Sequence, residues 1–278
     1  MIDLHSHTNQ SDGSYSPAEL VEEARRIGLE ALAITDHDTF AGYDEAAPIA
    51  ARNGLDLVCG VEVNSRSTAN RDAHILGYFL DGAPSREFRA WLAGLIESRR
   101  QRNRALIEKL RSMGVAIELS EVEAVGRTLT GRPHFARVLV DKGYAGSHEE
   151  AFRKYLGETA PGYVRRDSPE TAEVIRHIAA GGGLPVLAHP VRLGMRDAAR
   201  EEQFIAELQA AGLRGIEVYH SDHRPADVER YRALAEKLGL AISGGSDFHG
   251  AAKPHIPLGN AKVPRSVLDD LRRAVAAR

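Results

Sequence analysis

Histidine and carboxylate side chains follow short apolar segments at several separated places in the 278-residue sequence. In the first of these places, alternation along a strand would put Ile2 and Leu4 on one face and His5 and His7 on the other. Two imidazoles at positions i and i+2 can bind one metal ion. The polar loop that follows contains Asp12, a carboxylate that can turn back toward the same ion. These residue types and spacings therefore predict a metal site.

The same pattern recurs along the chain. A single histidine after a strand is more often a structural hydrogen-bonding group than a ligand, but random placement would rarely put six of the twelve histidines at strand ends together with three carboxylates. Barrel enzymes carry their sites at the C-terminal ends of strands, so these groups should converge. Nitrogen and oxygen donors without cysteine suit Mn²⁺, Fe²⁺ or Zn²⁺, and nine ligands indicate two or three ions. The predicted ligands are His5, His7, Asp12, His37, Glu62, His74, His189, Asp247 and His249.

The elements that must position these residues form an α/β pattern, in which short apolar runs alternate with longer amphipathic stretches. Ser16 and Glu19 form a capping box at the start of one helix, and Gly28 ends it. Seven strands are expected, at residues 2–7, 31–35, 56–63, 73–78, 185–189, 215–219 and 240–244. Further helices are expected at about residues 168–181, at 224–239 and after 264.

The pattern changes in the middle of the chain. Residues 84–166 contain no convincing strand, and helices are expected at about 85–113, at 133–142 and after the capping box that begins at Ser147. We therefore expect a helical substrate-binding subdomain inserted into a discontinuous catalytic barrel formed by residues 1–83 and 167–278. The insert has 16 Lys and Arg against 10 Asp and Glu, whereas the rest has 20 against 29. A basic insert beside an acidic body would attract an anionic substrate, although a solvated basic surface without a partner is equally compatible with this charge.

Composition excludes several classes of protein. No apolar run approaches the roughly 20 residues that span a bilayer, so we expect no membrane association and a cytoplasmic location. The single cysteine, Cys59, excludes an internal disulfide. No obligate protein partner is evident from the sequence.

The motifs that carry these ligands resemble, in type and order, those of the polymerase-and-histidinol-phosphatase (PHP) family of the amidohydrolase-like superfamily. The matching segments are His5-Ser6-His7, Thr35-Asp36-His37-Asp38, Gly60-Val61-Glu62, Asp72-Ala73-His74, Ala188-His189-Pro190 and Gly245-Ser246-Asp247-Phe248-His249-Gly250. The resemblance covers about 200 residues on both sides of the insert. It implies a distorted (β/α)7 barrel, in agreement with the strands expected above.

The resemblance also implies a distribution of the ligands among three ions, most simply Mn²⁺. One ion would be held by His5, His7, Glu62 and Asp247. A second would be held by Glu62, His74 and His189, which makes Glu62 the bridge. The third positions are matched by Asp12, His37 and His249.

For the chemistry, we hypothesise that a hydroxide bridging the first two ions attacks a phosphate monoester in line, with Glu62 and Asp247 as the catalytic carboxylates. Either His220 or His223 could protonate the leaving group or be structural. Asp36 and Asp38 are candidates for orienting imidazoles or substrate.

Substrate contacts are expected from the insert. Arg99, Arg102 and Asn103 lie near one face of its first helix, where a solvated basic face is the alternative. Arg132 and His134 begin another helix, where they could contact a phosphate together with free backbone N–H groups.

A helical insert between the His74 and His189 segments is similar to the branch of the family that removes the 3′-phosphate from nucleoside 3′,5′-bisphosphates, which is related to 5′-to-3′ exoribonucleases. This resemblance implies a small anionic nucleotide such as 3′-phosphoadenosine 5′-phosphate, or the 5′ ends of short RNA. Alternative activities are those of a histidinol phosphatase or an amidohydrolase, and a non-enzymatic alternative is a nucleotide-binding or polymerase-accessory module. Metal identity, base preference and oligomeric state stay open.

Overall fold

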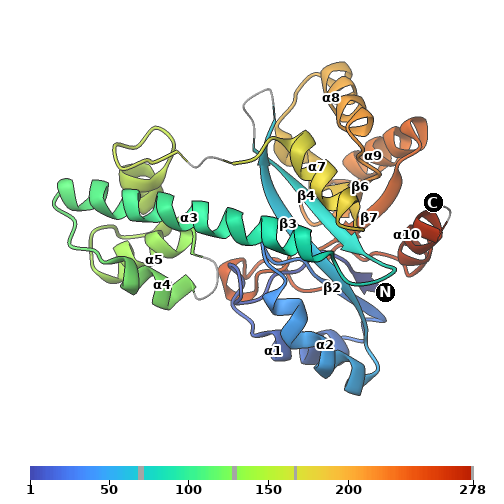
Figure 1. Cartoon of the computed structure of the whole chain (residues 1–278), viewed down its shortest axis with the longest axis horizontal. Helices are drawn as coiled ribbons and strands as arrows, with labels where there is room; N and C mark the ends of the chain where they lie inside the picture. Colours follow the sequence, from blue (N-terminus) through green and yellow to red (C-terminus); the bar gives the residue numbers. More distant parts are fainter. Residues whose placement is uncertain (68–71, 127–129, 166–167, 277–278) are drawn as a thin grey trace.

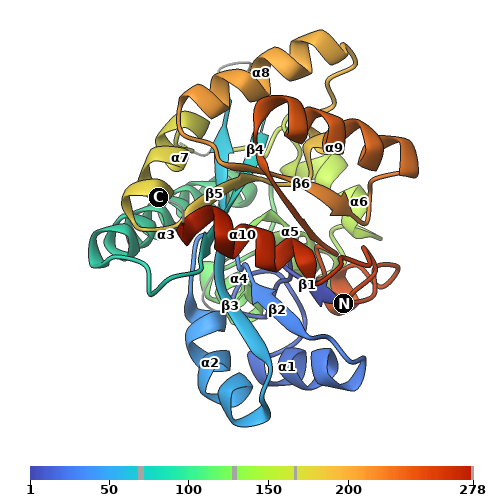
Figure 2. The same cartoon turned by 90° about the vertical axis from the view of Figure 1, so that its right-hand side faces the viewer.

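Seven strands form one sheet, in sequence order, in the computed structural model, which describes residues 1–67, 72–126, 130–165 and 168–276. The strands are β1 (Ile2–Asp3), β2 (Ala31–Ile34), β3 (Asp56–Arg66), β4 (Asp72–Phe79), β5 (Leu184–Leu187), β6 (Gly215–His220) and β7 (Ala241–Gly245). The first and last strands meet, because the Leu4 N–H donates to the Gly244 carbonyl at 3.1 Å and Ser6 forms a bridge with Phe248. The sheet is therefore a nearly closed barrel, and the α/β fold with seven strands is confirmed (Figures 1 and 2).

The direction of β4 differs from that of its neighbours. It pairs antiparallel with β3 and with β5, whereas the other neighbouring strands pair in parallel. Within the β3–β4 pairing, Asn64 lies opposite His74. The beginning of β4 therefore lies at the edge of the sheet where the parallel strands end.

Helices cover the outside of the barrel. They are α1 (Pro17–Arg26), α2 (Ala41–Asn53), α7 (Thr171–Ala180), α8 (Ala198–Ala210), α9 (Pro225–Leu238) and α10 (Ser266–Ala276), and single 3₁₀ turns follow β5 at Pro190–Leu193 and β7 at Gly250–Ala252. Figure 1 shows α1 and α2 together on one side of the sheet and α7, α8 and α9 on the other. The capping box is present, since Ser16 Oγ accepts from the Glu19 N–H and the Glu19 carboxylate accepts from the Ser16 N–H. Gly28 follows the end of α1 with a left-handed backbone, φ 74°.

Three expectations need correction. The first strand ends at Asp3 rather than residue 7. Beyond Asp3 its regular pairing stops, because the Leu4 N–H donates to Gly244 in β7 while the Ser6 carbonyl accepts from the Thr35 N–H after β2. The helix expected from Ser168 begins only at Thr171, since the Pro169 carbonyl accepts from the Arg66 N–H and so continues the edge of β3. Three helices, α2, α8 and α4 (Leu119–Gly126), were not predicted.

The central part of the chain is helical. It contains α3 (Arg86–Ser112), α4, α5 (Arg132–Asp141), α6 (His148–Ala151) and a π-helical turn at Phe152–Leu156. Figure 1 shows α3 extending from the barrel, with α4 and α5 near its far end. The first half of α3 packs on the barrel through Phe88 and Leu92, whereas its second half contributes Leu106 and Leu110 to a separate core.

This separate core supports the expected helical insert, although its boundaries stay a prediction and the predicted junction at 166–167 lies outside the described residues. Among the residues that the structure describes, no helix combines the length and the apolar character that crossing a bilayer requires.

Candidate metal centre

The nine predicted ligands gather at one edge of the barrel. His5 and His7 follow β1, His37 follows β2, and His189 follows β5. Asp247 and His249 follow β7, and Glu62 lies within β3, near its carboxyl end. His74 was counted among the side chains at the C-terminal ends of strands. It lies instead near the beginning of the antiparallel β4, which reaches the same edge from the opposite direction.

A first group consists of His5, His7, Glu62 and Asp247, all of them buried. Nε2 of His7 lies 3.3 Å from Glu62 Oε2 and 3.2 Å from Asp247 Oδ1, and Nε2 of His5 lies 3.5 Å from each of the same two oxygens. Ligand atoms that surround one ion at about 2.1 Å are separated from one another by about 3.0–3.4 Å. The spacing of this group therefore fits one divalent ion.

The second oxygen of Glu62 faces a different pair of imidazoles. Glu62 Oε1 lies 2.9 Å from Nδ1 of His74 and 2.9 Å from Nε2 of His189. One carboxylate thus presents each of its oxygens to a separate set of nitrogens, as a ligand that bridges two ions must do.

A third group lies on the other side of His7. It contains His7, Asp12, His37 and His249, with Asp12 Oδ1 3.4 Å from Nε2 of His249 and Asp12 Oδ2 3.7 Å from Nε2 of His37. The ring centroids of His7 and His249 are 4.3 Å apart. Asp12 thus turns back to the cluster from its loop, as the sequence predicted.

Two features indicate that the cluster is built for cations. Nε2 of His5, Nε2 of His7 and Oδ1 of Asp12 are buried without a hydrogen-bond partner, a costly arrangement unless an ion completes it. In addition, His189 and Asp247 have left-handed backbones, with φ of 27° and 57°, and strain of this kind collects at functional sites. The residues present therefore fit divalent ions bound through nitrogen and oxygen.

The electrostatics agree with this interpretation. Burial lowers the pKa of His37 to about 3, so its ring is neutral and keeps a lone pair for an ion. Burial opposes the charge on Glu62, but the imidazoles of His37 and His74 prevail and hold its pKa well below the usual range. Burial also acts against charge on His7, yet the nearby carboxylates of Asp247 and Glu62 raise its pKa to about 9. The field that holds a proton on His7 would equally attract a metal ion.

Contacts behind the ligands fix their orientation, and the sequence did not reveal them. Glu217, fully buried in β6, places Oε1 3.0 Å from Nδ1 of His5 and accepts from the His189 N–H at 2.7 Å. Arg192 and Lys253 lie 2.8 Å and 2.7 Å from Oδ2 of Asp247, which leaves Oδ1 toward the imidazoles. The available signal was a carboxylate in the middle of an apolar strand, since such a group is seldom buried without a role.

Glycine permits one close approach in the cluster. A Cβ atom at Gly245 would overlap the backbone of His5, so only glycine lets β7 lie this near to the segment that carries the first two imidazoles.

Of the two further histidines, His220 is the nearer to the ligands. Its Nδ1 accepts from the Asp222 N–H, and its buried Nε2 lies 3.9 Å from Oδ2 of Asp247 with no hydrogen-bond partner. His223 packs against Tyr231 and uses Nδ1 on the Val218 carbonyl at 2.8 Å.

Asp36 and Asp38 have different roles. Asp36 accepts from the hydroxyls of Thr8 and Ser11 and so supports the loop that carries Asp12, rather than an imidazole. Asp38 pairs with Arg99 and with the Asn64 amide, which lies 3.2 Å from Nδ1 of His37.

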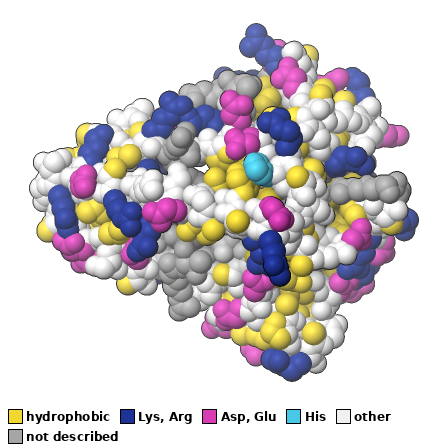
Figure 3. Space-filling view, in the orientation of Figure 1, with side chains coloured by type: hydrophobic (Ala, Val, Ile, Leu, Met, Phe, Trp, Pro, Cys, Tyr) yellow, Lys and Arg dark blue, Asp and Glu magenta, His cyan; other side chains and the backbone are white. Residues whose placement is uncertain are grey.

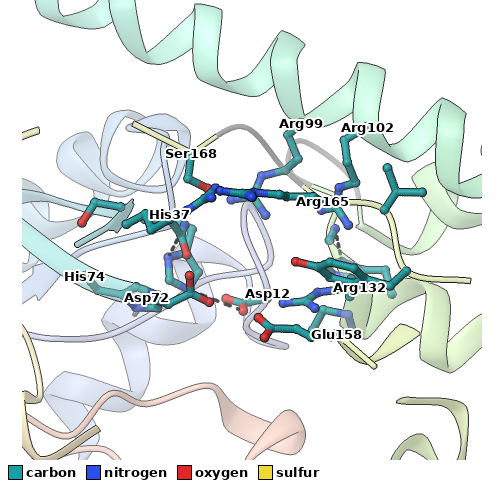
Figure 4. Close-up of a pocket in the computed structure, with 18 of the residues that line it drawn as sticks. Asp12, His37, Asp72, His74, Arg99, Arg102, Arg132, Glu158, Arg165 and Ser168 are labelled. Carbon is teal, nitrogen blue, oxygen red and sulfur yellow. Dashed lines mark hydrogen bonds and ion pairs between the residues drawn. The ribbon is translucent and has the colours of Figure 1, made fainter. Parts of the chain in front are cut away.

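A cavity of about 490 Å³ adjoins the cluster and extends to the insert. Figure 4 shows Asp12, His37 and His74 on one side and Arg99, Arg102, Arg132 and Arg165 on the other. Of the predicted substrate contacts, Arg99, Arg102, Arg132 and His134 line the cavity, together with Phe152 and Tyr163. Asn103 does not line the cavity. It is buried, and its amide donates to the Thr130 carbonyl at 2.9 Å, which supports the loop before α5.

Comparisons with known proteins agree with this geometry. A family model described as the PHP domain matches residues 3–156. The chain is 35% identical to a 3′,5′-nucleoside bisphosphate phosphatase of Chromobacterium violaceum, over 100% of this chain and 97% of that protein. It is 33% identical to a 5′-3′ exoribonuclease of Haemophilus influenzae, over 89% of each. A solved structure from Bifidobacterium adolescentis, assigned as a metal-dependent phosphoesterase, superposes with a TM-score of 0.86 at 33% identity, covering 98% of this chain and 96% of that one.

Proposed function

The chain belongs to the PHP domain family, and from this membership we propose that it is a metal-dependent phosphoesterase. Its substrates would be nucleoside 3′,5′-bisphosphates such as 3′-phosphoadenosine 5′-phosphate, which it would convert to the 5′-monophosphate and phosphate. The observation that carries this proposal is one cavity with two different ends. Asp12, His37 and His74 of the ligand cluster line one end, and four arginines from the central part of the chain, Arg99, Arg102, Arg132 and Arg165, line the other. A substrate with a phosphate at each end matches that division.

We assign the ligands to ions as the three groups in the structure suggest. His5, His7, Glu62 and Asp247 would hold one ion, Glu62 with His74 and His189 a second, and Asp12 with His37 and His249 a third. Divalent ions bound there would lower the pKa of a bound water molecule toward about 7, and their positive charge would stabilise the phosphoryl oxygens. Mn²⁺ suits the nitrogen and oxygen donors, and Fe²⁺ or Zn²⁺ are alternatives.

The chain's own groups would orient the reacting phosphate. Burial lowers the pKa of His220 to about 3, so its ring is neutral. Because its Nδ1 accepts from Asp222, its one proton sits on Nε2, which points toward Asp247 and can donate to an oxygen of the substrate. With that pKa, His220 is a hydrogen-bond donor and not a general acid. His223 donates from Nδ1 to the Val218 carbonyl, which makes it the weaker candidate for a contact with the substrate.

The second phosphate would bind at the insert. The guanidinium of Arg132 lies over the ring of Tyr163 at 5.6 Å, which holds it beside the cavity. Nδ1 of His134 accepts from the Gly131 N–H, so the neutral ring carries its proton on Nε2. Burial lowers the pKa of His134, in agreement with a neutral donor. The cavity volume of about 490 Å³ lies within the roughly 300–1,000 Å³ of small-molecule sites.

A second candidate function is 5′-to-3′ exoribonuclease activity on short RNA, because a relative matched over 89% of each chain has that activity in its name. The same arginines would then bind the 5′-phosphate of the RNA end. The face of the molecule in Figure 3, however, mixes Lys and Arg with Asp and Glu, rather than presenting a continuous basic track for a long strand. Within the described residues, this face therefore offers no extended basic surface for a long strand.

The test is a comparison of steady-state rates with Mn²⁺ present. The substrates are adenosine 3′,5′-bisphosphate, adenosine 3′-monophosphate, histidinol phosphate, a short 5′-phosphorylated RNA and an amide. We expect the highest kcat/KM for the bisphosphate, loss of turnover on exhaustive chelation, and recovery with Mn²⁺. Faster cleavage of the RNA would establish the second candidate instead. Negligible rates on every phosphate ester, or turnover that survives chelation, would contradict both.

A further inference from the structure

A buried ion pair joins the insert to the barrel beside the third group of ligands. Nη2 of Arg99, in α3, lies 2.6 Å from Oδ2 of Asp38, and the side chains are 12% and 0% exposed. The Arg89–Asp44 pair also joins α3 to the barrel, but its side chains are 37% and 50% exposed. Exposed pairs contribute little to stability, whereas breaking a buried pair leaves an unpaired charge in the protein. The Arg99 contact is therefore the one whose loss would disturb its surroundings.

Asp38 is tied to β3 as well as to the insert. Its own N–H donates to the Glu62 carbonyl at 2.9 Å, and its carboxylate accepts from the backbone and side-chain amides of Asn64 at 3.3 and 3.4 Å. Its φ of 54° is unfavourable for an aspartate, so surrounding contacts must sustain this conformation. Among these contacts of Asp38, the one with Arg99 carries a full opposite charge.

This arrangement ends at a predicted ligand. Asp38 directly follows His37 in the chain, and the Asn64 amide that contacts Asp38 also lies 3.2 Å from Nδ1 of His37. Nε2, the other nitrogen of His37, faces Oδ2 of Asp12 at 3.7 Å. Two routes, one along the backbone and one through Asn64, therefore connect the guanidinium of Arg99 to the orientation of the His37 ring.

We propose that Arg99 is a positioning residue, through which the helical insert sets the geometry of the third ion site at Asp12, His37 and His249. The inference rests on the proposed function, since it requires that these residues bind an ion. It predicts that ion affinity in the barrel depends on a side chain that belongs to the insert and touches none of the ligands. Contacts behind a metal ligand change affinity by roughly 10- to 100-fold when they are removed.

The decisive variant is Arg99→Met, which keeps the length of the side chain and removes its charge. Its matched control is Arg100→Met on the same helix, because Arg100 is half-exposed and pairs with Glu123 on the insert's surface. The readout is a titration of metal-free protein with Mn²⁺, by equilibrium dialysis and calorimetry. We expect three ions in the wild type, with one bound roughly 10- to 100-fold more weakly in Arg99→Met and the others within about twofold. Arg100→Met should bind like the wild type, and Arg99→Lys should recover part of the loss.

A different result would overturn the inference. If Arg99→Met raises KM but binds every ion as the wild type does, Arg99 is a substrate contact only. If the wild type binds fewer than three ions, the inference is also refuted. The proposed function is tested separately, by whether the wild type turns over the bisphosphate. Should thermal unfolding show that Arg99→Met does not fold, Asp38→Asn is expected to weaken the same ion, and an unchanged titration of that variant would equally contradict the proposal.

Discussion

The two ends of the cavity are constructed differently. At the barrel end, His5, His7, Glu62 and Asp247 are at most 1% exposed, and further buried or charged groups hold several of them from behind. At the insert end burial varies, because Arg102 is buried, Arg99 and Arg132 are partly buried, and Arg165 is exposed. Metal coordination tolerates errors of only a few tenths of an ångström, whereas an arginine can reach a phosphate from several directions. The barrel end is thus suited to holding metal ligands in one fixed geometry, and the insert end is suited to selecting a substrate.

The two ends also belong to different cores. The barrel residues rest on clusters that join the sheet to its outer helices, whereas Leu106, Leu110, Phe135 and Leu139 form a core within the insert. Only α3 contributes to both, among the helices that the structure describes. Substitutions at the barrel end should therefore affect every substrate alike, and substitutions at the insert end should affect substrates according to their second charged group.

The largest effect is expected for Glu62→Gln. Both oxygens of Glu62 face predicted ligands, so an amide at this position would weaken two ions together. Losing several kcal/mol of metal-derived stabilisation corresponds to at least about a thousandfold in kcat/KM. We expect that loss for the bisphosphate and for every slower phosphate ester, together with lower bound metal by elemental analysis.

The control is Glu121→Gln, since Glu121 pairs with Lys142 on the surface of the insert and should leave turnover and metal content unchanged. The contrast between the two ends would fail if Glu62→Gln kept metal and turned over substrate within about tenfold of the wild type.

A smaller effect is expected for Glu217→Gln. Its carboxylate contacts Nδ1 of His5 and the backbone of His189, but it is not among the predicted ligands. An amide can accept from one of these donors but not from both. We expect Mn²⁺ affinity to fall roughly 10- to 100-fold, with kcat restored at saturating metal. A fall in kcat that persists at saturating Mn²⁺ would show that Glu217 acts on the reaction and not on ligand position.

At the insert end, Arg132→Met should discriminate between substrates. Charged hydrogen bonds contribute about 1.5–3 kcal/mol, so KM for adenosine 3′,5′-bisphosphate should rise about tenfold or more. KM for adenosine 3′-monophosphate, which lacks the second phosphate, should change little. Arg137→Met on the same helix is the control, since Arg137 is exposed and faces Asp141. Equal changes for both nucleotides would mean that Arg132 does not bind the second phosphate.

The sequence predicted that the side chains of the barrel end lie together, because the signals there are local. An apolar strand followed by a histidine is visible in a few residues, and the sheet brings such ends together, as His5, His37 and His189 demonstrate. The direction of β4 was not predictable in this way. An isolated strand has the same period of two in either direction, so the strand pattern that put His74 among the predicted ligands does not show from which direction β4 reaches the cluster.

Contacts between distant segments were also beyond the sequence. Glu217 lies 212 residues from His5, and nothing around it in the sequence indicates its partner. Arg99 was predicted as a substrate contact because helical spacing shows which residues share a face, but not that one of them reaches Asp38. Tertiary packing decided these roles.

The smallest effect is expected for a partly exposed ion pair on the barrel, similar to the exposed pairs on the surface of the insert. Asp56 begins β3, at the edge away from the metal centre, and pairs with Arg272 and Arg265 at 2.8 and 2.7 Å. Because hydrogen bonds from Arg272 lower the pKa of Asp56, its stabilisation is present above its unfolded-state pKa of about 4 and is lost as the pH falls through the folded-state value. Asp56→Asn should therefore lower the free energy of unfolding by at most about 1 kcal/mol at pH 7, and by progressively less below pH 4.

Denaturant unfolding at several pH values measures this difference, and turnover of the bisphosphate should stay within about twofold of the wild type. If Asp56→Asn instead destabilised the protein equally at every pH, or reduced turnover strongly, the tolerance that we attribute to exposed pairs would not hold within the barrel. The whole barrel would then be more sensitive to substitution than the insert. Sensitivity would not be confined to the buried edge that carries the predicted metal ligands.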